Sequence, residues 1–339
     1  MKVKTAVLGA GQMGRRHIQV VRALGLDLVG VADPNPTALA AVQRDLQLPP
    51  DRLFQDPGKL LESRPECVIV ASTAPSHCEL SCLAAERGAG YILCEKPLAV
   101  SLAECDRMMA AAERHRTQLA VNHQMRFMPT YCEAKKTVDS EEFGGLSSLT
   151  VTAGNIGLAM NGSHLFELFR FLTDEAPAEV MAWFSEKELP NPRGSQFHDP
   201  AGQVRLTTAG GKRFYLEAGH EQGHGILLVF AGPNGLLTIN VLEGVMRTSL
   251  RRSHDRSLAT TRYATRPLLA SRKLPPPDAV ADTRAVLEAL LSGQDVPTAA
   301  QGRNCIQTLV AAYISQESGH IPVRFDDPKL PRERKFAWP

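Results

Sequence analysis

The histidine at the start of one predicted helix is the first residue in this sequence with an evident chemical use. In the stretch AMNGSHLFELFRFL, residues 159–172, apolar side chains recur at helical spacing and form one apolar face. His164 lies on this face one turn before Leu168, and residues 161–163 offer capping side chains upstream. The imidazole is either a hydrogen-bonded core group or an acid/base group directed into a pocket, because histidine titrates near pH ~6.5.

A lysine is the second candidate. Lys96 stands in CEKPL, residues 94–98, where a predicted strand ends. A lysine at a strand end is ordinarily a solvated charge, but at the ligand edge of a nucleotide-binding sheet it is a better candidate for a functional group. Pro97 follows, so the bond between them is a candidate for the cis form.

A glycine motif near the start predicts a dinucleotide site that could serve both residues. GAGQMG, residues 9–14, fits G-x-G-x-x-G, follows a short apolar run and opens a helical pattern. Gly9 permits a tight turn, Gly11 lets the backbone approach a pyrophosphate, and Gly14 allows close packing of helix and strand. A glycine-rich turn without a ligand is the alternative.

Asp33 predicts which dinucleotide binds. It ends the second predicted strand, 19 residues after Gly14. A carboxylate there accepts hydrogen bonds from ribose hydroxyls and repels a 2′-phosphate, so NAD is favoured over NADP.

These residues need a scaffold, and the first 123 residues supply one. Short apolar runs alternate with amphipathic helical patterns, which predicts a parallel sheet covered on both faces. From residue 124 the alternation stops. Strands are predicted at 180–184, 204–208, 213–218, 226–231 and 236–241, with hairpin signals at 209–211 and 233–235. We therefore expect an α/β chain: a Rossmann domain over 1–123, then an α+β domain over 124–339. Its sheet is open and mainly antiparallel, with helices at 282–291 and 302–315 beside it.

The motifs together resemble the glucose–fructose oxidoreductase/inositol dehydrogenase (Gfo/Idh/MocA) family. The segments that carry this resemblance are the glycine motif, the acid at 33, T-x-P-S-H at 73–77, E-K-P at 95–97, Asn122, MRFMP at 125–129, and residues 292–323. The resemblance implies hydride transfer between a nicotinamide cofactor, NAD or less readily NADP, and a hydroxyl or keto carbon of a sugar, cyclitol or nucleotide sugar. It also implies a homodimer or homotetramer.

Site residues follow from the resemblance by position. Lys96 and His164 match the catalytic lysine and histidine. The implied cofactor contacts are Gly9, Gly11, Gln12, Met13, Gly14, Asp33, Ser72, Thr73, Pro75, Glu95, Lys96, Asn122 and Arg126. The implied substrate contacts are Lys96, Arg126, Asn161 and His164.

One position departs from the family. Members resemble D-x-G-x-H at the start of this helix, with an aspartate that assists the histidine, but this chain has Met160 there. Methionine cannot polarise an imidazole, and the neighbouring Asn161 cannot accept a proton. Glu167 matches a common family acid that we interpret as structural. The segment between the strand at 149–153 and His164 is also short, so the usual substrate-contacting loop is trimmed.

Composition limits the other possibilities. The net charge is +2, from 38 basic and 36 acidic residues, so no general basic field for nucleic acid is expected. No secretory signal or membrane-length apolar run is present, and the seven cysteines show no C-x-x-C, which together favour a cytoplasmic, reducing compartment. The arginines at 247, 251, 252 and 256 are expected on a solvated strand face, with a local anion contact as the alternative.

A false metal motif is set aside. H-E-x-x-H occurs at 220–224, but zinc binding needs both histidines on one helix face, and glycines interrupt this segment. We expect no metal and interpret the segment as a loop near the substrate. Two other functions stay open. The same scaffold could act on a non-sugar carbonyl or imine, or could use tightly held NAD for transient oxidation. A non-catalytic NAD-binding sensor is the remaining alternative, with Met160 as its support.

Overall fold

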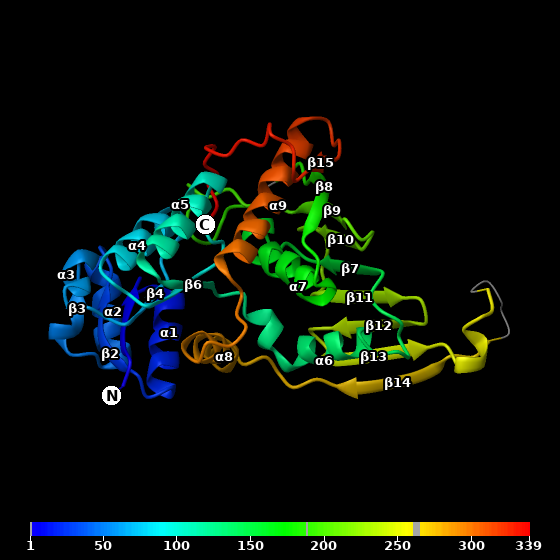
Figure 1. The fold of residues 1–339 in the computed structure, drawn as a ribbon, viewed down its shortest axis with the longest axis horizontal. Helices are drawn as coiled ribbons and strands as arrows, with labels where there is room; N and C mark the ends of the chain where they lie inside the picture. Colours follow the sequence, from blue (N-terminus) through cyan, green and yellow to red (C-terminus); the bar gives the residue numbers. More distant parts are fainter. Residues whose placement is uncertain (1, 188, 260–264) are drawn as a thin grey trace.

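The first half of the chain forms a six-stranded parallel sheet. The computed structural model describes residues 2–187, 189–259 and 265–339 (Figure 1). The strand order is β3-β2-β1-β4-β5-β6, that of the two-half dinucleotide-binding fold. The strands are β1 (Lys4–Leu8), β2 (Asp27–Ala32), β3 (Leu53–Phe54), β4 (Cys67–Val70), β5 (Tyr91–Cys94) and β6 (Gln118–Val121).

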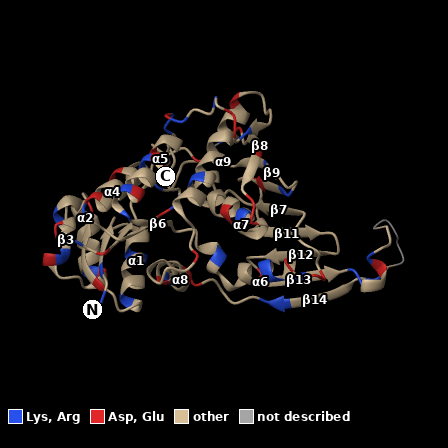
Figure 2. Cartoon of the chain, in the orientation of Figure 1, with Lys and Arg blue, Asp and Glu red and all other residues tan. Residues whose placement is uncertain are grey.

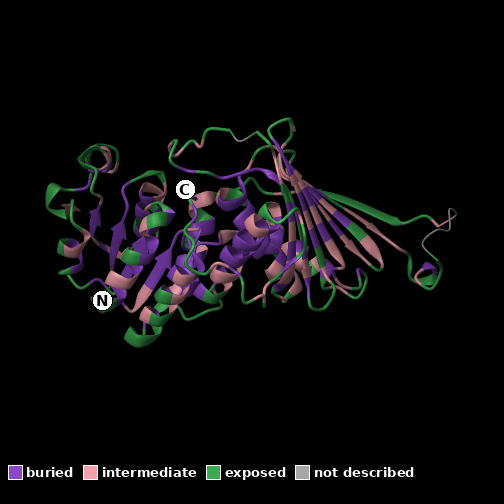
Figure 3. Cartoon of the chain, turned by 90° about the horizontal axis from the view of Figure 1, so that it is seen from above, coloured by how far each residue is buried: buried purple, intermediate pink, exposed green. Residues whose placement is uncertain are grey.

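Helices cover both faces of this sheet, as the continuous apolar strands require. Every residue of β4 is buried, and Figure 3 shows the interior strands of this half in the buried colour. The helices are α1 (Gln12–Ala23), α2 (Pro36–Leu46), α3 (Pro57–Leu61), α4 (Ala74–Glu86) and α5 (Leu102–His115). The predicted parallel sheet is thus confirmed.

The second half forms a nine-stranded open sheet. Its order is β14-β13-β12-β11-β7-β10-β9-β8-β15, with β7 and β10 the parallel pair and the other neighbours antiparallel. The strands are β7 (Ser148–Ala153), β8 (Pro177–Phe184), β9 (Gly202–Thr208), β10 (Arg213–Ala218), β11 (Leu227–Gly232), β12 (Gly235–Asn240), β13 (Val245–Leu250), β14 (Leu268–Lys273) and β15 (Val323–Arg324). The mainly antiparallel sheet and both predicted hairpins are confirmed.

One face of this sheet carries the core. Burial alternates along β7, β9 and β10, so every second side chain points inward. Phe166 and Phe169 of α7 (Ser163–Thr173) pack on Phe214 of β10, and α9 (Ala299–Glu317) packs on β8. Helix α6 (Pro129–Val138) precedes the sheet. The opposite face is open, as the fan of strands in Figure 3 shows.

The position of one helix differs from the prediction. We predicted a helix at 282–291 beside the second sheet, and the helix exists as α8 (Ala279–Leu291). It packs against α1 instead, and Val286, Leu287 and Leu290 join the core of the first sheet. The chain therefore returns to the first sheet after building most of the second. Periodicity identifies such an apolar face but not the surface that it covers.

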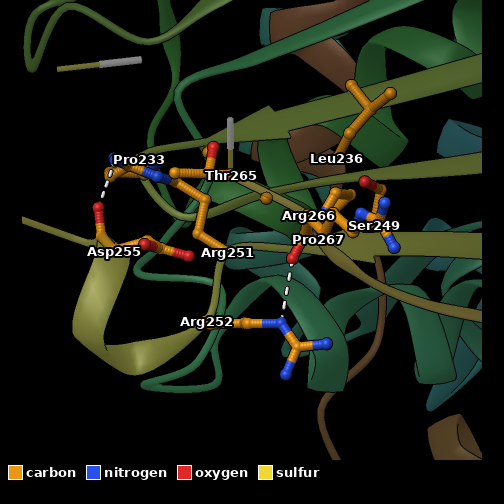
Figure 4. A pocket seen from close by; sticks show the side chains of 11 residues that line it. Pro233, Leu236, Ser249, Arg251, Arg252, Asp255, Thr265, Arg266 and Pro267 are labelled. Carbon is orange, nitrogen blue, oxygen red and sulfur yellow. Dashed lines mark hydrogen bonds between the residues drawn. The ribbon is translucent and has the colours of Figure 1, made fainter. Parts of the chain in front are cut away.

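The arginine cluster stabilises a loop at the far end of β13. Arg251 donates to the carbonyl oxygens of Asp255, Arg256 and Leu258, and Arg252 Nε donates to the Arg266 carbonyl at 2.9 Å. These residues border a pocket of about 430 Å³ (Figure 4). Most of these arginine side-chain donors thus form hydrogen bonds within the protein. Elsewhere, basic and acidic side chains are interspersed over both halves (Figure 2).

A larger pocket, of about 460 Å³, lies between α6, the end of β12 and the start of α8. Asp282 lines it with 6% of its surface exposed, and its Oδ2 has no hydrogen-bond partner. Burial, together with the charge of Asp278, raises the pKa of Asp282 to about 6. The folded protein therefore binds this proton more tightly than the unfolded chain does.

Asp282→Asn is expected to stabilise the protein near neutral pH. The stability gained from the bound proton is fully present below the unfolded pKa near ~3.9 and is lost as pH rises through the folded value of about 6. At pH 7.5 the variant should unfold with a free energy about 2 kcal/mol higher than the wild type, and this gain should shrink at pH 5. Urea unfolding at both pH values measures it. Glu288→Gln, at an exposed site on the same helix, is the control, and an equal gain there would contradict the assignment.

Candidate active site

The glycine motif forms a turn that only glycines permit. Gly9 has φ +113°, and a Cβ there would lie 2.6 Å from the Ala71 backbone. A Cβ on Gly14 would collide with the Gly9 carbonyl. Around Gly11 nothing lies within 4 Å of such a Cβ, so this side of the turn is open to a ligand. Gln12 and Met13 begin α1, and the amide groups of a first helical turn have no acceptor within the helix, so they can bind an anion.

Asp33 at the end of β2 ties this turn to its neighbour. Its Oδ2 accepts a hydrogen bond from the Ala10 amide at 2.8 Å, and its Oδ1 accepts one from Asn35 at the same distance. The carboxylate is only partly buried. Asp33 thus stands beside the glycine turn, where a ribose bound there could reach it.

The end of β4 contributes the next candidates. Thr73 and Pro75 are exposed at the start of α4, and Ser72 accepts a hydrogen bond from Ser76 Oγ. His77 is buried, with its ring nitrogens bonded to the Ser72 and Pro97 carbonyl oxygens. His77 therefore packs within the fold and is not free to contact a ligand.

Glu95 is a buried anchor at the end of β5. Its Oε1 lies 2.8 Å from both His17 Nε2 and Asn122 Nδ2, and its Oε2 accepts from the Lys96 amide. Burial alone would raise its pKa, but the His17 hydrogen bond and the charges of His17 and Lys96 lower it. Glu95 therefore holds Lys96 and Asn122 in place from inside the sheet.

Lys96 bridges the two halves of the molecule. Its Nζ donates a 2.5 Å hydrogen bond to the carbonyl oxygen of Met160, in the turn that leads to His164. The Lys96–Pro97 bond is cis, as predicted. Burial lowers the pKa of Lys96 to about 8, although the charge of Glu95 opposes the shift. The lysine is thus charged at neutral pH but can lose its proton in mildly basic solution.

The start of the His164 helix differs from the prediction. Residues 161–163 do not cap it. A π-helical turn, Leu158–Gly162, precedes α7, and no side chain caps the junction. Asp199 provides the missing acceptors from a distant loop, because its carboxylate accepts from the amides of Ala159 at 2.6 Å and Met160 at 2.9 Å. Asn161 is exposed, and its side-chain amide donates to the Ile156 carbonyl.

His164 is partly buried, and its Nδ1 is shielded from solvent without a hydrogen-bond partner. Burial lowers its pKa well below the ordinary value, and the charges of Lys96 and His123 add to this shift. The imidazole is therefore neutral at pH 7 and able to accept a proton. Lys96 is close enough for its charge to act on the His164 imidazole.

The sequence reasoning missed His123. It follows Asn122 at the end of β6, is 1% exposed, and meets His164 edge-on with ring centroids 5.5 Å apart. Both of its ring nitrogens lack partners, and burial lowers its pKa to about 3. The signal available was its position, because the carboxyl end of β6 borders the same edge as Lys96.

Arg126 is used inside the protein. Its guanidinium contacts Glu167, Asp295 and Gln301, and only 6% of the residue is exposed. These contacts correct the expectation that it faces substrate or cofactor. Glu167 also binds Arg170 through both oxygens, which confirms its structural role.

The H-E-x-x-H segment lies in a turn between β10 and β11 and not on a helix, so its histidines do not share a helix face. Within the described ranges, no group of three or more metal-ligating side chains is found. Nor is any described helix long and apolar enough to cross a bilayer.

A dinucleotide fits the residues present. The glycine turn leaves room at Gly11, and the Asn122 side-chain oxygen and both His123 nitrogens are buried without partners. Such orphaned polar atoms are rare unless a ligand or water completes them. They cluster where the strands of the first sheet end, next to Lys96, which is where this fold binds its cofactor.

Comparison with known proteins agrees with this class. The model of the "Oxidoreductase family, NAD-binding Rossmann fold" (GFO_IDH_MocA) matches residues 3–123. Inositol 2-dehydrogenase of Pseudomonas fluorescens strain SBW25 is 30% identical, over 70% of this chain and 74% of that protein. D-apiose dehydrogenase of Paraburkholderia graminis is 25% identical, over 94% of this chain and 88% of that protein.

A solved levoglucosan dehydrogenase, in complex with NADH, shares the fold with a TM-score of 0.78 at 19% identity, covering 96% of this chain and 99% of that one. The fold and site thus define an NAD-binding oxidoreductase. The chain belongs to the Gfo/Idh/MocA family.

Proposed function

We propose that this protein is an NAD-dependent dehydrogenase that oxidises a secondary hydroxyl of a sugar, cyclitol or nucleotide sugar, or reduces the corresponding ketone. The observation that carries this proposal is the hydrogen bond from Lys96 Nζ to Met160 O. It brings the lysine at the cofactor edge to the turn that opens the His164 helix. The relatives named above, which act on inositol and apiose by name, support the substrate class.

Lys96 and His164 have different roles in the proposed proton transfer. Bound NAD supplies the hydride acceptor. His164, held neutral, accepts the hydroxyl proton as general base, while the charged Lys96 donates a hydrogen bond to the same oxygen and stabilises its developing negative charge. In the reverse direction the imidazolium returns the proton to the ketone oxygen.

Met160 replaces the aspartate of the family, but Lys96 and His164 are both present. No carboxylate can extend from position 160, but Asp199 reaches the amide of the same residue from another segment. The negative charge of Asp199 favours the protonated form of Lys96. We therefore expect turnover by a lysine–histidine pair, with Asp199 as a positioning residue. A sensor without turnover has no need for this arrangement.

A substrate panel tests the proposal. Purified protein with NAD is screened against sugars, inositols and nucleotide sugars for absorbance change of the nicotinamide. Turnover with at least one secondary alcohol is expected. NADH binding without turnover or isotope exchange across the panel would overturn the proposal in favour of the sensor. Isotope exchange without net turnover would favour transient oxidation.

Cofactor choice gives a separate prediction for Asp33. Because a carboxylate repels a 2′-phosphate, NADH should bind at least about tenfold more tightly than NADPH. Asp33→Ser should narrow this ratio, since the charge is removed while a hydrogen-bonding group remains. Fluorescence titration with both nucleotides measures the ratio. Asp45→Ser, on the neighbouring α2, is the control, and equal affinities in the wild type would contradict the assignment.

We further propose that the segment 1–123 forms a cofactor-binding domain and 124–339 a substrate and assembly domain, despite the return of α8. The open face of the second sheet supports a homodimer or homotetramer, because Leu236 of β12 and Leu269 of β14 are exposed on it, in register through Ser249 of β13. Light scattering after gel filtration tests the assembly. Seven free cysteines support a reducing, cytoplasmic location.

A further inference from the structure

The loop at 190–200, between β8 and β9, covers the start of the catalytic helix. Asn191 Nδ2 lies 3.7 Å from the Met160 sulfur, and the Pro200 carbonyl accepts from the Leu158 amide at 3.0 Å. Asp199 binds two further amides of the same turn. Both ends of the loop are therefore fixed on the turn that carries Met160, whose carbonyl oxygen accepts the hydrogen bond of Lys96 Nζ.

Arg193 is the cation of this loop. Its amide donates to Asn191 Oδ1 at 2.9 Å, and Gly194 donates to the Asn191 carbonyl, so residues 191–194 form a tight turn. The residue is half-buried. In the described parts of the chain, no carboxylate forms an ion pair with its guanidinium. A half-buried arginine without an acidic partner is available to an anionic ligand.

The local charges support this interpretation. The positive charge of Arg193 lowers the pKa of Lys96, and it does so more strongly than Asp199 raises that pKa. Arg16 of α1 acts on Lys96 in the same direction. The two nearby carboxylates are already engaged, Glu95 by His17 and Asn122, and Asp199 by backbone amides. Three cations, Lys96, Arg193 and Arg16, thus stand near two carboxylates, Glu95 and Asp199.

We propose that the substrate carries an anionic group, a carboxylate or a phosphate, which Arg193 binds while the reacting hydroxyl meets Lys96 and His164. This inference rests on the proposed function and narrows its substrate class to sugar acids or sugar phosphates. A guanidinium pairs with either anion through two parallel hydrogen bonds, so Arg193 would also orient the substrate. The loop thereby takes over the recognition that the shortened segment before His164 cannot supply.

Matched substrate pairs test the inference. D-glucose is compared with D-glucuronate and with glucose 6-phosphate, and myo-inositol with its monophosphate, by kcat/KM with NAD. The wild type should prefer one anionic member at least about tenfold. Arg193→Gln should reduce that anionic-to-neutral ratio by about tenfold or more, mainly through KM, and Arg193→Lys should recover part of it. Arg213→Gln, at an exposed site on β10, is the control.

A binding readout separates this inference from the proposed function. Thermal shift of the NADH-loaded protein is measured with the same compounds. Stabilisation by an anion that depends on Arg193, without any turnover, would support the inference and overturn the proposed dehydrogenase. Turnover of neutral compounds, with an anionic-to-neutral ratio of kcat/KM that Arg193→Gln leaves unchanged, would support the proposed dehydrogenase and overturn this inference. Preference for the carboxylate or for the phosphate identifies which anion binds.

Discussion

His164→Asn is expected to lower kcat by about 10²–10⁴-fold while NADH affinity changes by less than about twofold. The imidazole is neutral at pH 7, since burial and then the charges of Lys96 and His123 lower its pKa. It can therefore accept the hydroxyl proton as the hydride leaves. An asparagine amide fills similar space and forms hydrogen bonds but takes no proton. Steady-state kinetics on the best substrate of the panel measure the loss.

Two further measurements make this result specific. His115→Asn changes an exposed histidine at the end of α5, and it should retain wild-type kcat. NADH fluorescence titration of His164→Asn shows whether the variant still binds cofactor. If His164→Asn kept more than about a tenth of wild-type kcat, general-base catalysis by this residue would be wrong.

The first sheet was predictable because its signals are local. Each strand is a short apolar run, and the glycine motif places a turn, a helix start and a ligand within six residues. The second sheet was predicted only where hairpin glycines or alternation marked it. Strand β14 is exposed along its whole length, so no buried face creates a periodic pattern. Strand β13 has Arg247 and Thr248 among apolar residues, and β15 has only two residues, so neither strand shows a clear alternating pattern.

The candidate site also contains residues that local sequence signals predict and residues that they do not. Lys96 follows from the rule that strand ends meet at the ligand edge, whereas Asn122 was predicted from the family resemblance; the same rule applies to Asn122 and His123. The start of α7 could not be found in this way. Two amides of the turn before it, those of Ala159 and Met160, are completed by Asp199, about 40 residues along the chain, and local capping rules cannot identify such an acceptor.

Arg126 illustrates how tertiary contacts override a motif. Its position in MRFMP implied a contact with substrate or cofactor. Asp295, on the segment before α9, and Gln301, in the first turn of α9, reach its guanidinium after the chain has returned from the second sheet. A buried guanidinium needs such partners, because an unpaired charge in the interior is costly. The return of α8 to the first sheet, and the path of the chain from there into α9, therefore determine what Arg126 contacts.

Lys96→Met should lower kcat/KM by about 10²–10³-fold and also change the shape of its pH profile. In the wild type, activity in the oxidative direction rises as His164 loses its proton, well below pH ~6.5, and falls as Lys96 loses its proton near pH 8. Without the lysine the basic limb should disappear. The acidic limb should move to higher pH, because the positive charge that lowers the pKa of His164 is gone.

Lys96→Arg distinguishes charge from shape. A guanidinium keeps the positive charge, so the acidic limb should stay at low pH, and it does not titrate in the measured range, so the basic limb should be absent. Profiles of kcat/KM from pH 5 to 9.5 for the three proteins provide the comparison. If the acidic limb did not move in Lys96→Met, the charges of Lys96 and His164 would not be coupled. The hydrogen bond from Lys96 to Met160 would then only hold the two halves of the molecule together. The role of Lys96 as a hydrogen-bond donor to the reacting oxygen would be wrong.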